Sequence, residues 1–326
     1  MSMDKKIKHE TDGKHVVFGS TGAYGYAIVR ELEKRGKNVV AVCRDEEKGS
    51  RLFSSKVDIF QADILFEDMV SKACEGASVI YAGFNFHYAD WKTNFPIGIR
   101  NLMKGCAGQN ALLVFPGNVY GYGKFEKLPV NEKHPLSARS KKGIIRNRME
   151  SELIEGHRKG QFDLIIPRFA DFYGPNVTND LYGAIFRNAI NGTRSLWPAN
   201  AAVPHQFTFI DDAAVATMDL VENPESYGEV FHVCGETISA RDFITKIYSS
   251  AGKHPEIRVV SKPLMALVGI FNSQAREILE LLYEYSEPYV LDDSKFRKFF
   301  PSFKYTNYEN GIRETLAWFR SHETTA

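Results

Sequence analysis

The sequence has few cysteines and no excess of charge of either sign. Four cysteines occur among 326 residues, and none stands at the paired spacing of a zinc site: Cys43, Cys74, Cys106 and Cys234. This scatter is typical of buried, reduced thiols, so we expect no metal centre. Lysine and arginine number 41 against 40 acidic residues, which leaves no global field to attract nucleic acid. We therefore expect no nucleic-acid partner.

A long hydrophobic run is also missing. Met1–Gly13 is polar and charged and lacks the apolar core of a secretory signal. The longest apolar stretch, Leu264–Phe271, is far shorter than a bilayer requires and contains Gly269, so it predicts a buried turn of helix. We expect a cytoplasmic protein without a membrane partner.

What the sequence does contain is a regular alternation of two patterns. Short β-branched runs alternate with longer segments of helical periodicity, such as the one expected over Lys141–Arg158. Because parallel strands need long crossovers, this alternation predicts an α/β fold with helices on both faces of a parallel sheet. The expected strands in the first half of the chain are His15–Gly19, Asn38–Cys43, Val57–Phe60, Ser78–Ala82, Ala111–Phe115 and Asp163–Pro167. Strand-like patterns return later in the chain at Gln206–Ile210 and Glu229–Val233.

After Pro167 the pattern is less regular. Loops rich in glycine, proline and asparagine are expected around Gly174–Asn179 and Trp197–Pro204, and packed helices over Asp292–Arg320. We interpret this part of the chain as a second lobe.

The strongest local motif is a glycine-rich turn between the first expected strand and a helix. Small residues let the backbone approach a pyrophosphate, and a helix N-terminus offers free N–H groups to it. The spacing, Gly-x-x-Gly-x-x-Gly, differs from the usual Gly-x-Gly-x-x-Gly fingerprint, so a purely structural turn stays the alternative. The candidate cofactor-binding residues here are Gly19, Ser20, Thr21, Gly22, Ala23, Tyr24 and Gly25, the last of which would permit close packing of helix on strand.

Arg44 follows the second expected strand, where an NAD-specific site usually carries a carboxylate. A guanidinium pairs well with a phosphate, so Arg44 favours NADP as the cofactor. Asp45, the next residue, keeps NAD as an alternative, and a solvated surface arginine is the other interpretation of Arg44.

Several motifs in order along the chain resemble the NAD-dependent epimerase/dehydratase family, which is the extended type of short-chain dehydrogenase/reductase. They are Gly19–Gly25, Asp63, Ala82-Gly83, Val119-Tyr120-Gly121, Arg168–Pro175, Phe207–Ala214 and Val290–Arg320. The resemblance implies a doubly wound parallel sheet (Rossmann fold) with a smaller C-terminal substrate lobe. We accordingly expect a dinucleotide-binding domain over 12–171 and 206–236, and the lobe over 172–205 and 237–326.

The resemblance also implies positions around the cofactor. Asp63 and Ile64 would lie near the adenine, Ala82 and Gly83 would line the dinucleotide, and Pro167 to Ala170 would border the nicotinamide. The alternative for Asp63 is an ordinary helix cap.

The family's catalytic residues are largely missing. The resemblance places Pro116 or Gly117 where a serine or threonine is usual, and Ser137 where the tyrosine of Tyr-x-x-x-Lys is usual. Lys141 is retained, and it could hydrogen-bond the nicotinamide ribose. A serine hydroxyl ionises far less readily than a phenol, so we weigh Ser137 as a catalytic residue against a helix cap.

Two tyrosines offer phenols near the missing group. Tyr120 is a candidate proton donor, with packing beneath the second lobe as its alternative, and Tyr122 is a second phenol in the same loop. Five cations between Arg139 and Arg148 could receive an anionic substrate such as a nucleotide sugar, or simply be solvated. The candidate substrate-binding residues are Asn118, Tyr122, Arg168 and His205.

Two functions follow from these observations. The first is an NAD(P)-dependent oxidoreductase or epimerase/dehydratase that transfers hydride to or from a sugar-like or other small carbonyl or alcohol substrate through an atypical proton donor. The second is a non-catalytic NADP-binding sensor that lost the catalytic groups. Ile145, Met149 and Leu153 could form a homodimer face or belong to the core.

Overall fold

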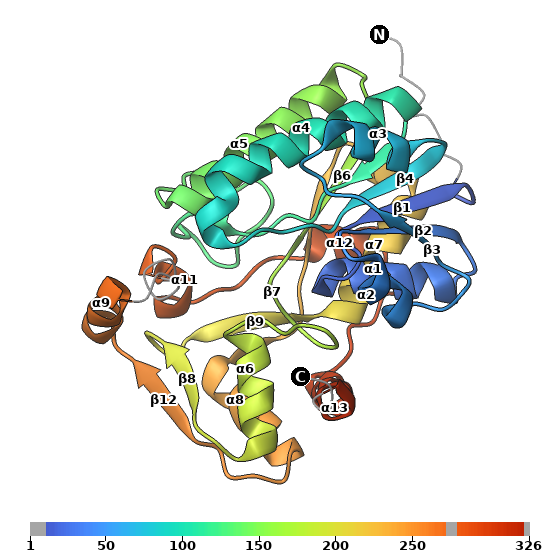
Figure 1. Ribbon diagram of the computed structural model, residues 1–326. Helices are drawn as coiled ribbons and strands as arrows, with labels where there is room; N and C mark the ends of the chain where they lie inside the picture. Colours follow the sequence, from blue (N-terminus) through green and yellow to red (C-terminus); the bar gives the residue numbers. More distant parts are fainter. Residues whose placement is uncertain (1–10, 272–278, 323–326) are drawn as a thin grey trace. The chain divides into compact units, whose positions relative to one another are not determined.

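The computed structural model describes residues 11–271 and 279–322 (Figure 1). Its contacts divide the chain into two compact units. Unit 1 holds the described residues within Met1–Gly117, Ile145–Arg168 and Ala213–Phe231, and unit 2 holds those within Asn118–Ile144, Phe169–Asp212 and His232–Ala326. The second unit is therefore of similar size to the first, and it includes 118–144 and 206–212, which we had expected in the dinucleotide-binding domain.

Unit 1 is built on a seven-stranded sheet in the order β10-β6-β5-β4-β1-β2-β3. Its pairs from β3 to β6 are parallel. Strands in such a sheet are buried on both faces, which explains their nearly continuous β-branched runs. The strands are β1 (Lys14–Phe18), β2 (Asn38–Cys43), β3 (Asp58–Gln61), β4 (Ala77–Ala82), β5 (Leu112–Val114), β6 (Asp163–Phe169) and β10 (Val230–Val233), which confirms the predicted parallel sheet.

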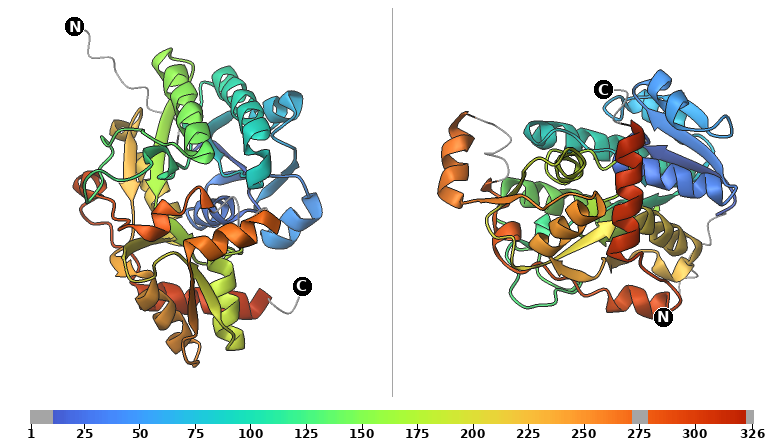
Figure 2. Two further views of the ribbon diagram at one scale, coloured as in Figure 1. Left: turned by 90° about the vertical axis from the view of Figure 1, so that its left-hand side faces the viewer. Right: turned by 90° about the horizontal axis from the view of Figure 1, so that it is seen from below.

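Helices cover both faces of this sheet (Figure 1). One face carries α1 (Ala23–Lys34), α2 (Glu46–Leu52) and α7 (Ile210–Glu222), and the other carries α3 (Glu67–Cys74), α4 (Trp91–Gln109) and α5 (Lys141–Arg158). The helices α4 and α5 lie side by side in Figures 1 and 2. On α5, Met149 and Leu153 are buried in the core, so they do not form the exposed homodimer face considered above.

Unit 2 contains two small sheets and a group of helices. The sheets are β11-β9-β7 and β12-β8, and α6 (Tyr182–Asn191), α8 (Ala240–Ser250) and α13 (Tyr308–His322) pack against one another. Stacked rings of Phe207 and Phe243, with centroids 4.1 Å apart, mark its core. The strands are β7 (Asp171–Tyr173), β8 (Ser195–Pro198), β9 (Pro204–Phe209), β11 (Thr237–Ser239) and β12 (Ile257–Val260).

Two expectations for unit 2 were wrong. Trp197 and Pro198 end strand β8 and do not begin a loop. The apolar stretch from Leu264 does form a helix, α9 (Lys262–Phe271), but its side chains are not uniformly buried: Met265 is buried whereas Leu267 is 58% exposed. The C-terminal helices α12 (Ser294–Phe299) and α13 confirm the prediction for the tail.

All four cysteines are free and buried, as predicted. Among the residues described, no helix is both long and apolar enough to cross a membrane.

Candidate functional site

The glycine-rich turn connects β1 to α1 in unit 1. Gly19 adopts the left-handed conformation with φ +67°, and Gly22 is the N-cap of α1. A Cβ atom on Gly25 would lie 2.3 Å from the carbonyl oxygen of Gly19, so the helix packs on the turn only because residue 25 has no side chain. Thr21 and Ala23 are half-buried within the same turn. The turn therefore leaves backbone at the start of a helix close to the sheet edge, the arrangement that suits a pyrophosphate.

Two side chains of the turn face the protein interior. The Ser20 hydroxyl donates to the carbonyl oxygen of Val42 at 3.0 Å, and the Tyr24 hydroxyl pairs with Thr217 Oγ1 at 2.9 Å. Both side chains are buried. Ser20 and Tyr24 thus stabilise the turn, and only their backbone groups are candidates for contact with a cofactor.

The carboxyl ends of four adjacent strands bring the other unit 1 candidates into one row. The strand order β4-β1-β2-β3 places Gly83, Gly19, Arg44 and Asp63 successively along one edge of the sheet. A Cβ on Gly83 would lie 2.8 Å from the Phe18 carbonyl oxygen, so this close approach also requires glycine. In open α/β sheets a ligand binds outside the carboxyl ends of the strands, which is where this row lies.

Two neighbours in that row make local hydrogen bonds. Asp63 Oδ1 accepts from the backbone N–H of Leu65 at 3.0 Å, which makes a short turn ahead of α3. Because α3 has Phe66 as its N-cap, the helix-cap alternative for Asp63 was wrong. Ile64 is buried, and its carbonyl oxygen accepts from Asn101 Nδ2 at 2.9 Å. Ala82, the last residue of β4, is also buried.

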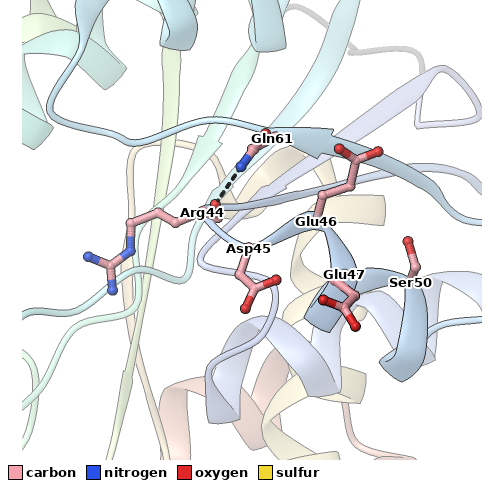
Figure 3. A pocket seen from close by; sticks show the side chains of 6 residues that line it. All are labelled: Arg44, Asp45, Glu46, Glu47, Ser50 and Gln61. Carbon is pink, nitrogen blue, oxygen red and sulfur yellow. Dashed lines mark hydrogen bonds between the residues drawn. The ribbon is translucent and has the colours of Figure 1, made fainter.

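Arg44 lines a pocket at the end of β2 together with Asp45, Glu46, Glu47, Ser50 and Gln61 (Figure 3). Its side chain extends away from Glu46 and Glu47, while its carbonyl oxygen accepts from Gln61 Nε2 at 2.9 Å. Asp45 Oδ1 accepts from the backbone N–H of Lys48 at 2.9 Å, as the N-cap of α2. The carboxylate that kept NAD as an alternative is therefore occupied as a helix cap, whereas Arg44 is exposed and makes no ion pair with a described residue.

The first turn of α5 differs from the prediction for Ser137. The helix begins at Lys141, and its capping hydroxyl is that of Ser140, which accepts from the Gly143 N–H at 3.1 Å. Ser137 lies before the helix and donates to the Tyr122 carbonyl oxygen at 2.8 Å. The helix-cap interpretation of Ser137 was wrong, and Ser137 and Lys141 do not share a helical face.

The lysines at this point have contrasting environments. Lys141 is exposed, and its backbone N–H donates to Glu280 Oε2 at 3.1 Å. The neighbouring Lys142 is buried, and its Nζ pairs with Glu280 Oε1 at 2.5 Å. We expected Lys142 only as one of the five cations that could receive an anionic substrate or be solvated, and its burial contradicts both interpretations, whereas Glu280 was not predicted as a functional residue.

The two tyrosines of the predicted catalytic loop also differ. Tyr122 is wholly buried, and its hydroxyl forms a hydrogen bond with His232 Nε2 at 2.6 Å. The phenol therefore belongs to the core of unit 2, and we no longer propose Tyr122 as a substrate-binding residue. Tyr120 is half-buried against the same apolar cluster, as its packing alternative predicted. Asn118, also half-buried, accepts from the Tyr120 N–H at 3.2 Å. Ala170 is a buried member of this cluster.

Arg168 forms a buried ion pair with Glu150. It lies one residue after Pro167 on β6, and its guanidinium pairs with Glu150 of α5, both side chains being 3% exposed. One turn earlier on α5, the Arg146 guanidinium lies over the rings of Trp91, Phe95 and Phe115 at 5.2, 5.3 and 5.5 Å. Arg168 therefore has a structural role where we expected substrate binding.

His205 is likewise held inside unit 2. Its Nε2 lies 2.9 Å from Asp171 Oδ2, which also accepts from the Tyr182 hydroxyl, and its ring stacks on that of Tyr289 with centroids 4.5 Å apart. The ring is buried, so His205 does not present a free edge to a substrate in this structure.

Some of the missed residues left a signal in the sequence. Lys142, Arg146 and Glu150 stand four residues apart, which places three charged side chains on one face of the predicted helix. A solvated face was the simpler interpretation. The structure shows that this face is turned inward, because Lys142 and Glu150 are both buried.

The parallel sheet and the glycine-lined turn at its carboxyl edge define a Rossmann-type dinucleotide-binding fold. Residues 15–234 match the model of the NAD dependent epimerase/dehydratase family. A curated relative, UDP-N-acetyl-alpha-D-glucosaminuronate decarboxylase of Bacillus cytotoxicus, is 22% identical over 94% of this chain and 98% of its own length.

Solved structures show the same fold. The dTDP-glucose 4,6-dehydratase of Bacillus anthracis in complex with NAD has a TM-score of 0.79 at 16% identity, covering 96% of this chain and 98% of that one. The UDP-glucose 4-epimerase of Thermotoga maritima with UDP-glucose has a TM-score of 0.76 at 16% identity, covering 94% and 99%. Because the family match spans more than half of the chain, this protein belongs to the NAD dependent epimerase/dehydratase family, which confirms the predicted family, fold and class of nicotinamide-dependent function.

Proposed function

We propose that this protein is an NADP-dependent enzyme that transfers hydride at a carbinol or carbonyl carbon of a nucleotide sugar. The observation that carries the proposal is the turn at Gly19, Gly25 and Gly83, where added Cβ atoms would collide with backbone. Such a cradle admits a pyrophosphate against the N-terminus of α1. The curated decarboxylase and the solved epimerase and dehydratase, all named for nucleotide sugars, support this substrate class.

Different residues would bind different parts of the dinucleotide. The backbone of Gly19 to Gly25 would hold the pyrophosphate, Asp63 and Ile64 the adenine end, and Ala82 and Gly83 the middle of the dinucleotide. Arg44 would pair with a 2′-phosphate, since its guanidinium is exposed and Asp45 is occupied as a helix cap. When bound, the nicotinamide supplies the hydride chemistry.

Fewer contacts support the residues that we propose around the nicotinamide and the substrate. Pro167 and Ala170 would border the nicotinamide, Lys141 would hydrogen-bond its ribose, and Tyr120 and Asn118 would face the substrate. The exposed cations Arg139 and Lys141 suit an anionic substrate such as a nucleoside diphosphate sugar. A homodimer stays a prediction, without Met149 or Leu153 in its interface.

A non-catalytic NADP-binding sensor is the second candidate. The observation that favours it is the loss of the usual serine or threonine hydroxyl at Pro116 or Gly117 and of the usual tyrosine phenol at Ser137, together with the burial of Tyr122. Hydride transfer separates the two functions, since a sensor binds NADP without reducing it in the presence of any nucleotide sugar.

A fluorescence titration with NADPH and NADH in parallel tests the proposal. We expect NADPH to bind more tightly, and Arg44→Glu to lose about tenfold to a hundredfold of that affinity, because a charge-assisted phosphate contact becomes a repulsion. Arg51→Gln is the matched control, since Arg51 is an exposed arginine of the same helix region. Equal binding of the two dinucleotides would contradict the assignment of NADP, and binding of neither would contradict the proposed function.

A further inference from the structure

The Arg146 guanidinium of unit 1 is held among aromatic rings. Its Cζ atom lies 5.2, 5.3 and 5.5 Å from the ring centroids of Trp91, Phe95 and Phe115, close enough for each ring face to attract the cation. All three rings are buried, whereas Arg146 is half-buried. Its Nη1 donates to the carbonyl oxygen of Pro116 at 3.4 Å. These contacts fix a positive charge of α5 against α4 and the segment that follows β5.

The sheet order indicates what lies at this end of β5. The order β3-β2-β1-β4-β5-β6 is that of a Rossmann sheet built from two mononucleotide-binding halves, and it reverses between β1 and β4. The glycine-rich turn, Arg44 and Asp63 all belong to the half formed by β1, β2 and β3. If the adenosine part of the dinucleotide binds there, the nicotinamide part lies over the carboxyl ends of β4, β5 and β6.

Backbone contacts join this end of β5 to the residues that we propose around the nicotinamide. The Gly117 N–H donates to the carbonyl oxygen of Pro167 at 2.8 Å, and Gly117 also forms a parallel bridge with Arg168. Arg146 bonds to Pro116, the residue before Gly117, so its guanidinium lies beside these contacts. All five residues belong to unit 1. A positive charge is therefore fixed at the part of the sheet edge where the nicotinamide would meet its substrate.

We propose that Arg146 is a catalytic residue whose guanidinium stabilises negative charge on the substrate oxygen. This inference rests on the proposed function. In the reduction of a carbonyl group, the C–H bond of the reduced nicotinamide breaks, and its electron pair forms a new C–H bond at the carbonyl carbon. The C=O π electrons move to the oxygen, which pairs with Arg146 as an alkoxide and then takes a proton from water, leaving hydroxide. The substrate is reduced and the dinucleotide is oxidised, and a carbinol is oxidised by the same steps in reverse.

A guanidinium suits this role because it is permanently charged and stabilises an oxyanion without giving up a proton. It carries five N–H donors in a fixed fork, so the contact with Pro116 does not exhaust it. The buried rings shield one side of the charge from water, and charges interact more strongly where the surroundings are less polar. Removal of one donor to an oxyanion typically costs about a hundredfold to a thousandfold in rate.

Single-turnover reduction of bound NADP by UDP-glucose, UDP-N-acetylglucosamine and dTDP-glucose, followed by absorbance, is the first test. With the sugar that reacts, we expect Arg146→Met to slow hydride transfer at least about a hundredfold at saturating sugar. NADPH affinity should stay within twofold of the unmodified chain, and guanidinium ion should restore rate to Arg146→Ala. Arg30→Met is the matched control, because Arg30 of α1 also lies over a ring, that of Tyr26 at 5.4 Å, and it should leave the rate unchanged.

A second measurement needs no variant and does not depend on turnover. Phenylglyoxal modifies arginines, and mass spectrometry gives the modified fraction at each residue. With NADPH bound, so that no hydride can be transferred to the cofactor, the sugar at about ten times its Kd should slow modification of Arg146 about tenfold. Modification of Arg30 should not change. This result keeps the inference testable if Arg146→Met fails to fold.

Three outcomes would overturn the inference. Hydride transfer by Arg146→Met within threefold of the unmodified rate removes Arg146 from catalysis and leaves the proposed function standing. Absence of guanidinium rescue in Arg146→Ala, together with equal modification of Arg146 with and without sugar, shows that its role is packing against the rings. Failure of the unmodified chain to bind NADPH or to reduce NADP with any of the three sugars overturns the proposed function as well.

Discussion

Glu150 and Arg168 form an ion pair with both side chains almost completely removed from solvent. The pair joins the inner face of α5 to β6 in unit 1. Breaking a buried pair by removing one partner leaves a charge without compensation in a medium of low polarity.

We therefore expect Arg168→Met to lower the free energy of unfolding by ~3–5 kcal/mol in urea denaturation. The double variant Glu150→Leu with Arg168→Met should recover much of that loss, because it leaves no lone charge. Arg148→Met is the control, since Arg148 pairs with Glu152 at an exposed position, and it should cost less than ~1 kcal/mol. Equal losses for Arg148→Met and Arg168→Met would contradict this account.

Gly25→Ala should damage the glycine-rich turn between β1 and α1, which we propose to bind the cofactor. The added Cβ would meet the Gly19 carbonyl oxygen at 2.3 Å and could be accommodated only by moving the turn or α1. Overpacking of this kind costs ~1–3 kcal/mol. We expect a lower free energy of unfolding and a loss of NADPH affinity of at least tenfold, measured by urea denaturation and fluorescence titration.

Gly108→Ala is the control for that substitution. Gly108 lies inside α4, and a Cβ there would meet no heavy atom within 4 Å apart from its chain neighbours and the backbone of its own helix. Alanine should stabilise the helix by up to ~1 kcal/mol and leave NADPH binding unchanged. A Gly25→Ala variant that binds NADPH normally would show that the turn tolerates a side chain.

Glu284 should make stability depend on pH. Burial, with a smaller contribution from Asp171, raises the pKa of its carboxyl well above the ordinary value. A carboxyl with a raised pKa in the folded state binds a proton more tightly there than in the unfolded state. Its contribution to stability is complete below the ordinary pKa of glutamate and is lost as pH rises towards the raised value.

We expect Glu284→Gln to remove this dependence. Relative to that variant, the unmodified chain should lose up to ~1.4 kcal/mol of unfolding free energy per pH unit above about pH 5, in urea denaturation at a series of pH values. Glu287→Gln, at an exposed position, should show no such difference. A constant gap between Glu284→Gln and the unmodified chain at every pH would disprove the effect.

Tyr122→Phe separates a core role from a catalytic one. The substitution removes the hydroxyl that bonds to His232 and leaves a buried nitrogen without its partner, at a cost of ~1–3 kcal/mol. We expect lower stability in urea and an unchanged rate of hydride transfer in folded protein. A large fall in that rate at full folding would return Tyr122 to the active site.

Local sequence patterns predicted the parts of the fold that depend on local physics. A strand buried on both faces needs a run of apolar, β-branched residues, and a close turn needs glycine. The strands β1 and β2 and the turn to Gly25 could therefore be predicted from the sequence alone. The strands β8 and β12 were missed because their pairing joins two segments that lie far apart in the sequence, which leaves no local signal.

The sequence by itself determined the family, the glycine-rich turn between β1 and α1 and the position of Arg44 at the end of β2. Only the tertiary structure decided which of two adjacent lysines is buried, because that depends on where α5 begins, at Lys141 rather than near Ser137. It alone could supply Glu280, since the choice of a charge partner 138 residues away follows from packing in three dimensions and leaves no mark in the local pattern. Burial likewise assigned Tyr122 and Arg168 to the core, because a side chain's access to solvent is a property of the folded chain.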